Sequence, residues 1–332
     1  MTIPLPAFAY LTPRTLGEAT RLLADPQRRA TIVGGGTDLL PKMKRRQVAP
    51  PALLSLRGVQ ELRGIRIDDE GACVIGASTT LHEIVHSSLV PEVVSAAAAL
   101  VASPQIRNTA TIGGNLCLDT RCNYIDMPEG WRRACGPCMK DGGDTCWVAP
   151  RGDRCWAVSS TDLAPVAIAL GASVRLTSVR GDRLIPIEDL YRNDGIAYQT
   201  REPDEILAEL VLPAREWRAT YRKLRRRGSI DFPLLGVAAA IRLDDAGRCT
   251  SARIVLGAVA SAPLRATDAE EFVIGRELTE ATIEKAARLA SGPVRPQDNT
   301  DMGSRYRKWM IAVYVGRALK DLAPAAHDRN VR

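Results

Sequence analysis

The chain has 332 residues, of which 45% are hydrophobic and 25% charged. This is the composition of an ordinary globular protein, long enough for two or three domains and a substantial core. The net charge of +7 is moderate and spread along the sequence, and no run of about 18 apolar residues exists, so neither a strongly basic nucleic-acid-binding protein nor a membrane span is expected.

The first 15 residues do not have the basic stretch followed by an apolar stretch that marks a secretory signal. We therefore expect a cytoplasmic protein. In that compartment cysteine thiols stay reduced, and clustered cysteines bind metal more often than they pair.

Residues 1 to about 213 are predicted to alternate between strands and helices. Two capping boxes, Thr15–Glu18 and Thr80–Glu83, each predict a helix start. The second box places His82 and His86 one helical turn apart, and we interpret them as surface residues in preference to a metal pair. Further helices are expected at 39–44, 91–102 and 163–170, and strands at 30–33, 53–56, 73–75, 172–177 and 206–212.

Two glycine-rich turns are candidate anion-binding sites. The first, Gly34-Gly-Gly-Thr-Asp38, follows a predicted strand and precedes a predicted helix, so its backbone N–H groups and the helix dipole could hold a phosphate. It is neither a Walker loop nor a Gly-x-Gly-x-x-Gly motif, because Leu39 stands where the third glycine belongs. The second turn, Thr111-Ile-Gly-Gly-Asn115, could act in the same way. Either one alone could be a plain tight turn.

Six of the eight cysteines lie between Cys117 and Cys155, in an irregular stretch rich in Gly, Pro, Asp and Arg. A loop of this length is usually functional or disordered. Disulfides, zinc and iron–sulfur are the candidate stabilising groups. Zinc usually takes two Cys-x-x-Cys knuckles or adds histidines, but there is one knuckle, at Cys135–Cys138, and no histidine nearby. The spacing favours a [4Fe–4S] cluster.

The C-terminal third is predicted to form a separate α+β domain with a three-stranded antiparallel sheet. Its densest basic run, 222–227, could be a nucleic-acid patch, but no aromatic residues are interleaved, and a solvated strand edge or a surface for an acidic partner is the simpler interpretation. We expect the tail, 324–332, to be frayed. Strands are expected at 221–226, 236–243 and 252–260, and helices at 269–274, 281–290 and 304–322.

Several stretches appear in the order found in the FAD-binding subunits of the xanthine dehydrogenase / CO dehydrogenase family of molybdenum hydroxylases, which the chain resembles over nearly its whole length. They are ATIVGGGTDLLPKMK, IGASTTLHEIV, IRNTATIGGNL, STDLAPVAIALGA and YRKLRRRGSIDFPLLGVAAAI. The resemblance implies an α+β fold: a two-subdomain FAD-binding domain of the vanillyl-alcohol-oxidase type over residues 1–216, followed by a smaller domain over 217–323.

The resemblance also implies where FAD binds. The two glycine turns would cradle its pyrophosphate, Asp162 would lie near the flavin or its ribityl chain, and Lys223 would lie near the isoalloxazine ring. The residues of the two turns are Ile32, Val33, Gly34, Gly35, Gly36, Thr37 and Asp38, then Thr111, Ile112, Gly113, Gly114 and Asn115.

The insertion at about 117–158 departs from the usual pattern of the family and resembles that of the β subunits of 4-hydroxybenzoyl-CoA reductases, a branch of it. The resemblance implies a [4Fe–4S] cluster on Cys122, Cys138, Cys146 and Cys155. The spacing alone would have favoured Cys135. Cys117 and Cys135 would then be spare thiols, and Cys73 and Cys249 are most simply structural.

No ferredoxin-type cysteine motif and no molybdopterin domain is present in this sequence, so the resemblance implies no catalytic residue on this chain. Substrate chemistry would take place on a large molybdopterin-binding partner, with a small [2Fe–2S] partner between them, in a dimer of heterotrimers. The implied function is electron transfer from reduced ferredoxin for the reductive removal of the phenolic hydroxyl of 4-hydroxybenzoyl-CoA, which gives benzoyl-CoA in anaerobic aromatic degradation. A xanthine or N-heterocycle dehydrogenase subunit and a metal-cluster regulator that binds nucleic acid are the alternatives.

Overall fold

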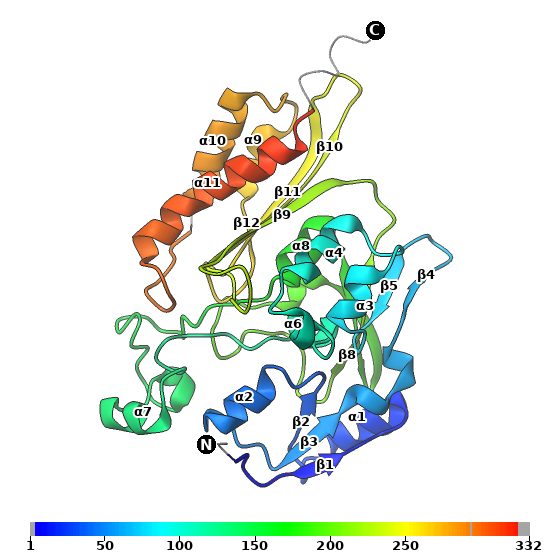
Figure 1. The fold of residues 1–332 in the computed structure, drawn as a ribbon, viewed down its shortest axis with the longest axis vertical. Helices are drawn as coiled ribbons and strands as arrows, with labels where there is room; N and C mark the ends of the chain where they lie inside the picture. The colour runs from blue at the N-terminus through cyan, green and yellow to red at the C-terminus, as the bar shows by residue number, and fades with distance from the viewer. Residues whose placement is uncertain (1–3, 293, 325–332) are drawn as a thin grey trace.

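The computed structural model describes residues 4–292 and 294–324, in which three sheets follow one another along the long axis of the molecule (Figure 1). The first is a small parallel sheet of order β1-β3-β2, next to helices α1 and α2. Because β2 runs directly into the first glycine turn, this sheet fixes where that turn lies. The elements are β1 (Ala9–Leu11), α1 (Leu16–Ala24), β2 (Ala30–Val33), α2 (Leu39–Lys44) and β3 (Ala52–Ser55).

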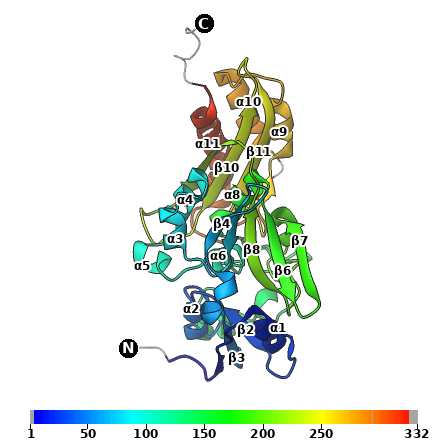
Figure 2. The same cartoon turned by 90° about the vertical axis from the view of Figure 1, so that its right-hand side faces the viewer.

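The second sheet is antiparallel and has the order β4-β5-β8-β6-β7. Its central strand, β8, comes about 130 residues after β5 in the sequence, so the chain leaves this sheet and returns to it. Figure 2 shows α3 and α4 on one side of this part of the molecule, and β6 and β7 on the other. The strands are β4 (Ile65–Ile67), β5 (Cys73–Gly76), β6 (Ser173–Ser178), β7 (Gly181–Pro186) and β8 (Ile206–Leu212).

Helix α8 (Leu163–Leu170) joins the second sheet to the C-terminal part of the chain. All eight of its residues are buried, as expected of a helix that is apolar on every face. It packs on α4 (Glu92–Ala99) and on strands β10 and β11, so one continuous hydrophobic core extends across both parts of the molecule. Helix α6 (Ile112–Leu116) also packs on α8, whereas α3 (Leu81–His86) packs on α4 and on α5 (Pro104–Arg107).

The C-terminal sheet is antiparallel, with the order β12-β11-β10-β9, and helices α9, α10 and α11 complete this α+β unit. It has one strand more than the three expected, because the two-residue β12 has too short a pattern to be recognised in the sequence. The elements are β9 (Arg218–Leu224), β10 (Leu235–Leu243), β11 (Cys249–Gly257), β12 (Leu264–Arg265), α9 (Thr267–Val273), α10 (Glu280–Ser291) and α11 (Ser304–Leu322).

The basic run at 222–227 is engaged within the chain. Arg222 pairs with Asp321, Arg226 with Asp301 and Arg227 with Asp231. Lys223 pairs with Asp162, and Arg225 donates to the Leu100 carbonyl. Each of these cations therefore has an intramolecular partner, which fits a strand edge better than a free phosphate-binding patch.

The cysteine-rich insertion projects from the side of the molecule as a mostly irregular chain with one helix, α7 (Glu129–Cys135), that its sequence pattern did not predict (Figure 1). A two-way backbone bridge between Arg121 and Val158 closes its stem, with N···O distances of 2.8 and 2.7 Å. Asn299, in the loop before α11, bonds both strands of the stem, since its carbonyl accepts from Asn123 and its amide donates to the Trp156 carbonyl.

The expected helix caps and the two helix histidines lie within the described residues. Thr80 and Glu83 form a full capping box, whereas the Thr15 side chain caps its helix without the return bond from Glu18 to the Thr15 N–H. His82 and His86 are neighbours on α3, with ring centroids 4.3 Å apart. No described helix is both long and apolar enough to cross a bilayer. Residues 325–332 of the expected tail lie outside the described ranges.

Candidate functional site

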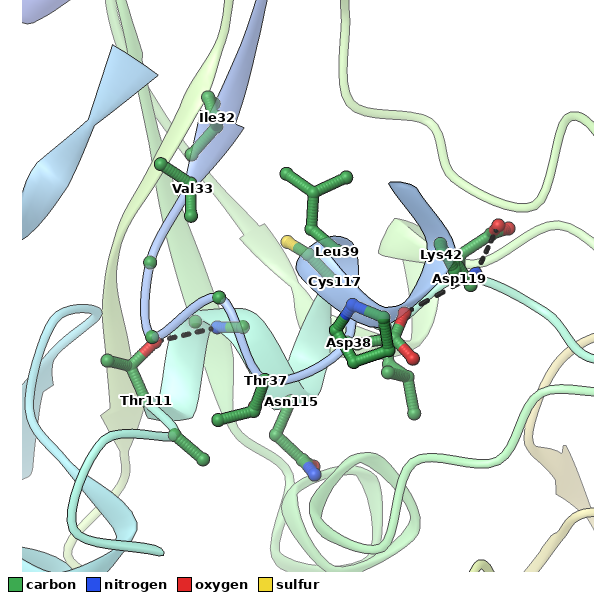
Figure 3. Close-up of a pocket in the computed structure, with 18 of the residues that line it drawn as sticks. Ile32, Val33, Thr37, Asp38, Leu39, Lys42, Thr111, Asn115, Cys117 and Asp119 are labelled. Carbon is green, nitrogen blue, oxygen red and sulfur yellow. Dashed lines mark hydrogen bonds and ion pairs between the residues drawn. The ribbon is translucent and has the colours of Figure 1, made fainter. Parts of the chain in front are cut away.

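A cavity of about 790 Å³ lies where the first sheet, α6 and the stem of the insertion meet. Both glycine turns line it. Residues from three other segments also line it: Leu118, Asp119, Arg121, Ser160, Asp162 and 230–232. Figure 3 shows the first turn, with Thr37 and Asp38, next to the second, with Thr111 and Asn115. The two turns, some 75 residues apart in sequence (from 36 to 111), therefore share one cavity.

The first turn offers backbone donors to this cavity. In the described part of the chain, no hydrogen bond uses the N–H groups of Gly35, Gly36, Thr37 or Leu39. Asp38 precedes α2 without capping it. Unpaired N–H groups beside a helix start are suited to an anion such as a pyrophosphate, and the donor set therefore fits one end of a dinucleotide.

Two glycines of the first turn are required by geometry. A Cβ on Gly35 would lie 2.0 Å from the Thr109 carbonyl oxygen, so a side chain there would force the two turns apart. Gly36 has φ of +73°, a left-handed conformation that suits glycine. The glycines thus allow the turns to approach each other closely, and this approach leaves the donors facing the cavity.

The second turn lines the same cavity but has already used its donors. Ile112 N–H donates to Thr79 O, Gly113 N–H to Ala77 O, and Gly114 N–H to the Thr111 hydroxyl. The Asn115 amide oxygen accepts from the Thr161 hydroxyl at 2.7 Å and from Leu163 N–H at 3.2 Å. This turn forms a wall and fixes the start of α8, so it differs from the expectation that both turns would supply phosphate donors.

Asp162 lines the cavity, and Lys223 does not. Lys223 Nζ lies behind the carboxylate, 2.9 Å from Oδ2, and also donates to the Leu100 carbonyl. The Tyr221 hydroxyl donates to Oδ1 at 2.8 Å. Burial raises the pKa of Asp162 and lowers that of Lys223, while their mutual attraction opposes both shifts. Lys223 therefore holds Asp162 in position from behind.

Other residues of the cavity have no motif in the sequence that would identify them. Arg121 lies 4.1 Å from the centroid of the Phe232 ring and donates to Asp38 at 3.0 Å. Tyr198 also lines the cavity, and burial raises its pKa. These side chains come from the insertion stem, a loop before β8 and the β9–β10 connection, so only the folded chain brings them together.

A second, small cavity lies inside the insertion and is lined by Cys122, Cys138, Cys146 and Cys155. Burial first, and then the other three thiols, raise the pKa of the Cys122 thiol to about 12. Trp147 and Lys140 also line this cavity. Because Trp147 is 38% exposed, the cavity lies just beneath the surface.

The remaining cysteines are elsewhere. Cys117 lines the large cavity, and Cys135 is exposed on α7. Cys73 and Cys249 are buried in strands, and burial raises the pKa of both. The four thiols of the small cavity therefore form the set that the family resemblance implied, and Cys135 is not part of it despite its Cys-x-x-Cys spacing.

Within the described residues, no group of three or more His, Cys, Asp or Glu side chains stands ready to chelate a single metal ion. A tetrahedral zinc ion would need sulfurs roughly 3.8 Å apart, given a Zn–S bond of about 2.3 Å. An iron–sulfide cubane holds its cysteine sulfurs farther apart, with its own sulfides between them. The four thiols line one cavity of about 10 Å³, so as they stand they hold neither a single metal ion nor a cubane, and the loop would have to widen around a cluster.

Comparison with known proteins identifies two families along the chain. Residues 6–215 match the FAD binding domain in molybdopterin dehydrogenase, and residues 219–322 match the CO dehydrogenase flavoprotein C-terminal domain. The chain is 29% identical over 320 residues to the carbon monoxide dehydrogenase medium chain of Afipia carboxidovorans, covering 95% of this chain and 96% of that one. It is 32% identical over 284 residues to the nicotinate dehydrogenase FAD-subunit of Eubacterium barkeri, with 83% of each chain covered.

Comparison with solved structures supports the same family assignment. The chain of a Cu,Mo-CO dehydrogenase superposes with a TM-score of 0.79 at 27% identity, covering 96% of this chain and 99% of that one. The carbon monoxide dehydrogenase of Hydrogenophaga pseudoflava gives 0.79 at 28% identity, with 96% and 98% covered. Together with the two turns and their shared cavity, these matches show that the chain belongs to the FAD-binding subunits of the molybdenum hydroxylase family.

Proposed function

We propose that this FAD-binding oxidoreductase subunit also carries a [4Fe–4S] cluster on Cys122, Cys138, Cys146 and Cys155. The supporting observation is that four cysteines, spread over 34 positions (122 to 155), line one cavity while two nearby cysteines do not. Four thiolates from an irregular loop suit a cubane. The metal would supply folding energy that this loop cannot obtain from its own small core.

In the flavin site, the residues of this chain bind the FAD and fix its orientation. The N–H groups of the first turn bind the pyrophosphate, and α6 forms the opposite wall. Asp162, held by Lys223 and Tyr221, presents a fixed acceptor to the flavin side of the cavity. When bound, the flavin exchanges electrons one or two at a time, so it can connect one-electron carriers to two-electron chemistry.

We further propose that the complex is a reductase of 4-hydroxybenzoyl-CoA, or of a closely similar aromatic thioester, driven by reduced ferredoxin. Loss of a phenolic hydroxyl needs low-potential electrons, and a thiolate-ligated cluster can lie at the low end of the biological range. Partners would be a large molybdopterin chain and a small [2Fe–2S] chain, arranged as a dimer of heterotrimers.

The basic residues of the insertion could steer an acidic ferredoxin towards it, or they could simply solvate the loop; they are Arg132, Arg133, Lys140, Arg151 and Arg154. Four of them are engaged within the chain: Arg132 with Asp141, Arg133 with Glu129, Lys140 with Asp119, and Arg154 over the Trp156 ring. Exposed Trp131 and Trp147, 42% and 38% accessible, are better candidates for the contact with ferredoxin. Trp147 also lines the cysteine cavity.

The second candidate function is an N-heterocycle dehydrogenase without a cluster on this chain. Its support is the 32% identity to a subunit whose name is nicotinate dehydrogenase FAD-subunit. In that case the four cysteines would be unligated, and the insertion would have to fold without metal.

Two measurements on the complex purified without oxygen separate these candidates. The proposal predicts turnover of 4-hydroxybenzoyl-CoA to benzoyl-CoA with reduced ferredoxin, and iron that is lost when Cys122 is replaced. Turnover of nicotinate or xanthine, with iron content unchanged by Cys122→Ser, would instead support the dehydrogenase.

A further inference from the structure

Asp119 lies between the two cavities and accepts a hydrogen bond from a lysine on each side. Its Oδ2 is 2.6 Å from Lys42 Nζ, and its Oδ1 is 2.8 Å from Lys140 Nζ. Both lysine side chains are nearly buried, at 7% and 12% exposure. One carboxylate thus pairs with two ammonium groups that water reaches poorly.

Each lysine belongs to a different cavity. Lys42, on α2, lines the large cavity and lies 3.3 Å from Asp38 in the first glycine turn. Figure 3 shows Lys42 between Asp38 and Asp119. Lys140 lines the cavity of the four cysteines. An unbroken series of ion pairs therefore leads from the flavin turn to the cysteine cavity.

The two lysines do not depend on Asp119 equally. Lys42 has a second carboxylate, Asp38. The other hydrogen-bond partners of Lys140 are neutral, namely the Thr120 hydroxyl at 2.8 Å and the Gly195 carbonyl at 2.6 Å. A nearly buried ammonium that loses its carboxylate is strongly destabilising, so without Asp119 Lys140 must leave its place in the wall of the cysteine cavity.

We propose that Asp119 is a positioning residue that makes the flavin turn and the cysteine loop assemble as one unit. The part of this inference that concerns the iron–sulfur cluster rests on the proposed function. Lys42 holds Asp119 to α2, and Asp119 holds Lys140 in the wall of the cysteine cavity. Order in the flavin turn then favours order in the loop, and the reverse follows because coupling between two sites is reciprocal.

The test is a double-mutant cycle in the full chain, produced with its partners, that compares Asp119→Asn, Lys140→Met and the double variant. Asparagine keeps the shape but removes the charge and turns an N–H₂ towards one lysine. Asp119→Asn should weaken flavin binding on the order of tenfold or more and should also lower iron content. The double variant should recover much of the flavin affinity, because the uncompensated ammonium is gone and Lys42 keeps Asp38.

Arg133→Met is the matched control, since it breaks an exposed ion pair in the same insertion and should change neither cofactor. Wild-type flavin and iron in Asp119→Asn, or losses that simply add in the double variant, would overturn the role of Asp119.

If Asp119→Asn does not fold, Lys140→Met provides an independent readout. It should speed hydrogen exchange of residues 34–44 although it alters the other cavity, and unchanged exchange there would contradict the coupling. A wild-type chain that holds flavin but no iron would contradict the proposed cluster, whereas the flavin and exchange results would still decide the role of Asp119.

Discussion

The flavin cavity is walled in large part by the ends of regular elements, β2, α2, α6 and the start of α8, and loop residues such as Arg121, Tyr198 and Phe232 complete it. The cysteine cavity is walled by a loop whose regular parts are α7 and one short turn. The first has its backbone donors in place before any ligand arrives. The second has a buried thiol, Cys122, whose pKa burial raises, and a very small apolar core. One site is thus preorganised by the fold, and the other would obtain its order from what it binds.

The strongest way to break the preorganised site is Gly35→Val. The new Cβ would lie 2.0 Å from the Thr109 carbonyl, so the two turns must separate and the donors lose their alignment. We expect essentially complete loss of flavin, measured by absorbance after purification. Gly17→Ala is the control, since a Cβ there meets nothing within 4 Å. Full flavin content in Gly35→Val would mean that the close approach of the turns is not needed.

Cys146→Ser tests the cysteine cavity, where the order of the surrounding loop would depend on the cluster that it binds. Cys146 is buried and lines the cysteine cavity. We expect the variant to keep FAD and its partners, to lose the iron of this chain and most ferredoxin-driven turnover, and to become sensitive to protease at residues 117–158. Cys135→Ser, an exposed thiol outside the cavity, should behave like the wild type. Normal ferredoxin-driven rates without this iron would refute the relay role.

These two regions were also predictable to different degrees. The turn at 34–38 and the cysteine-rich loop could be recognised in the sequence, because glycine next to a strand and clustered thiols have a local pattern. The choice of four cysteines came from the family resemblance, since the spacing alone favoured Cys135. Arg121, Tyr198 and Phe232 could not, since they reach the cavity from three loops that only the tertiary fold brings together. The sequence also did not show that Gly113 and Gly114 use their own N–H groups within the chain, because that depends on Ala77 and Thr111.

A smaller effect is expected from Asp162→Asn. Lys223 is 1% exposed and would lose its carboxylate, at a cost of about 3 kcal/mol in stability. Weaker flavin binding should accompany the lower melting temperature. Combining Asp162→Asn with Lys223→Met should restore part of the stability, measured by thermal unfolding. No recovery in the double variant would show that the pair does not act together.

The smallest effect should come from Glu209, in the second sheet, away from both cavities. Burial raises its pKa, but hydrogen bonds from Arg66 and Arg175 outweigh burial and lower it below 4.5. The carboxylate therefore stabilises the fold above pH 4.5, and this contribution is lost as the pH falls below that value. Glu209→Gln should cost roughly 1 kcal/mol near pH 7 and weaken the acid dependence of unfolding, with flavin and iron unchanged. An acid profile identical to the wild type would contradict this.

The most direct test of the central claim is the difference in iron and acid-labile sulfide between the wild-type complex and Cys122→Ser, measured per flavin after oxygen-free purification. Taking the difference removes the contribution of the [2Fe–2S] partner. The proposed cluster predicts a loss of about four irons and about four sulfides per chain, with one FAD retained. Equal iron in both preparations would show that the four thiols bind no cluster.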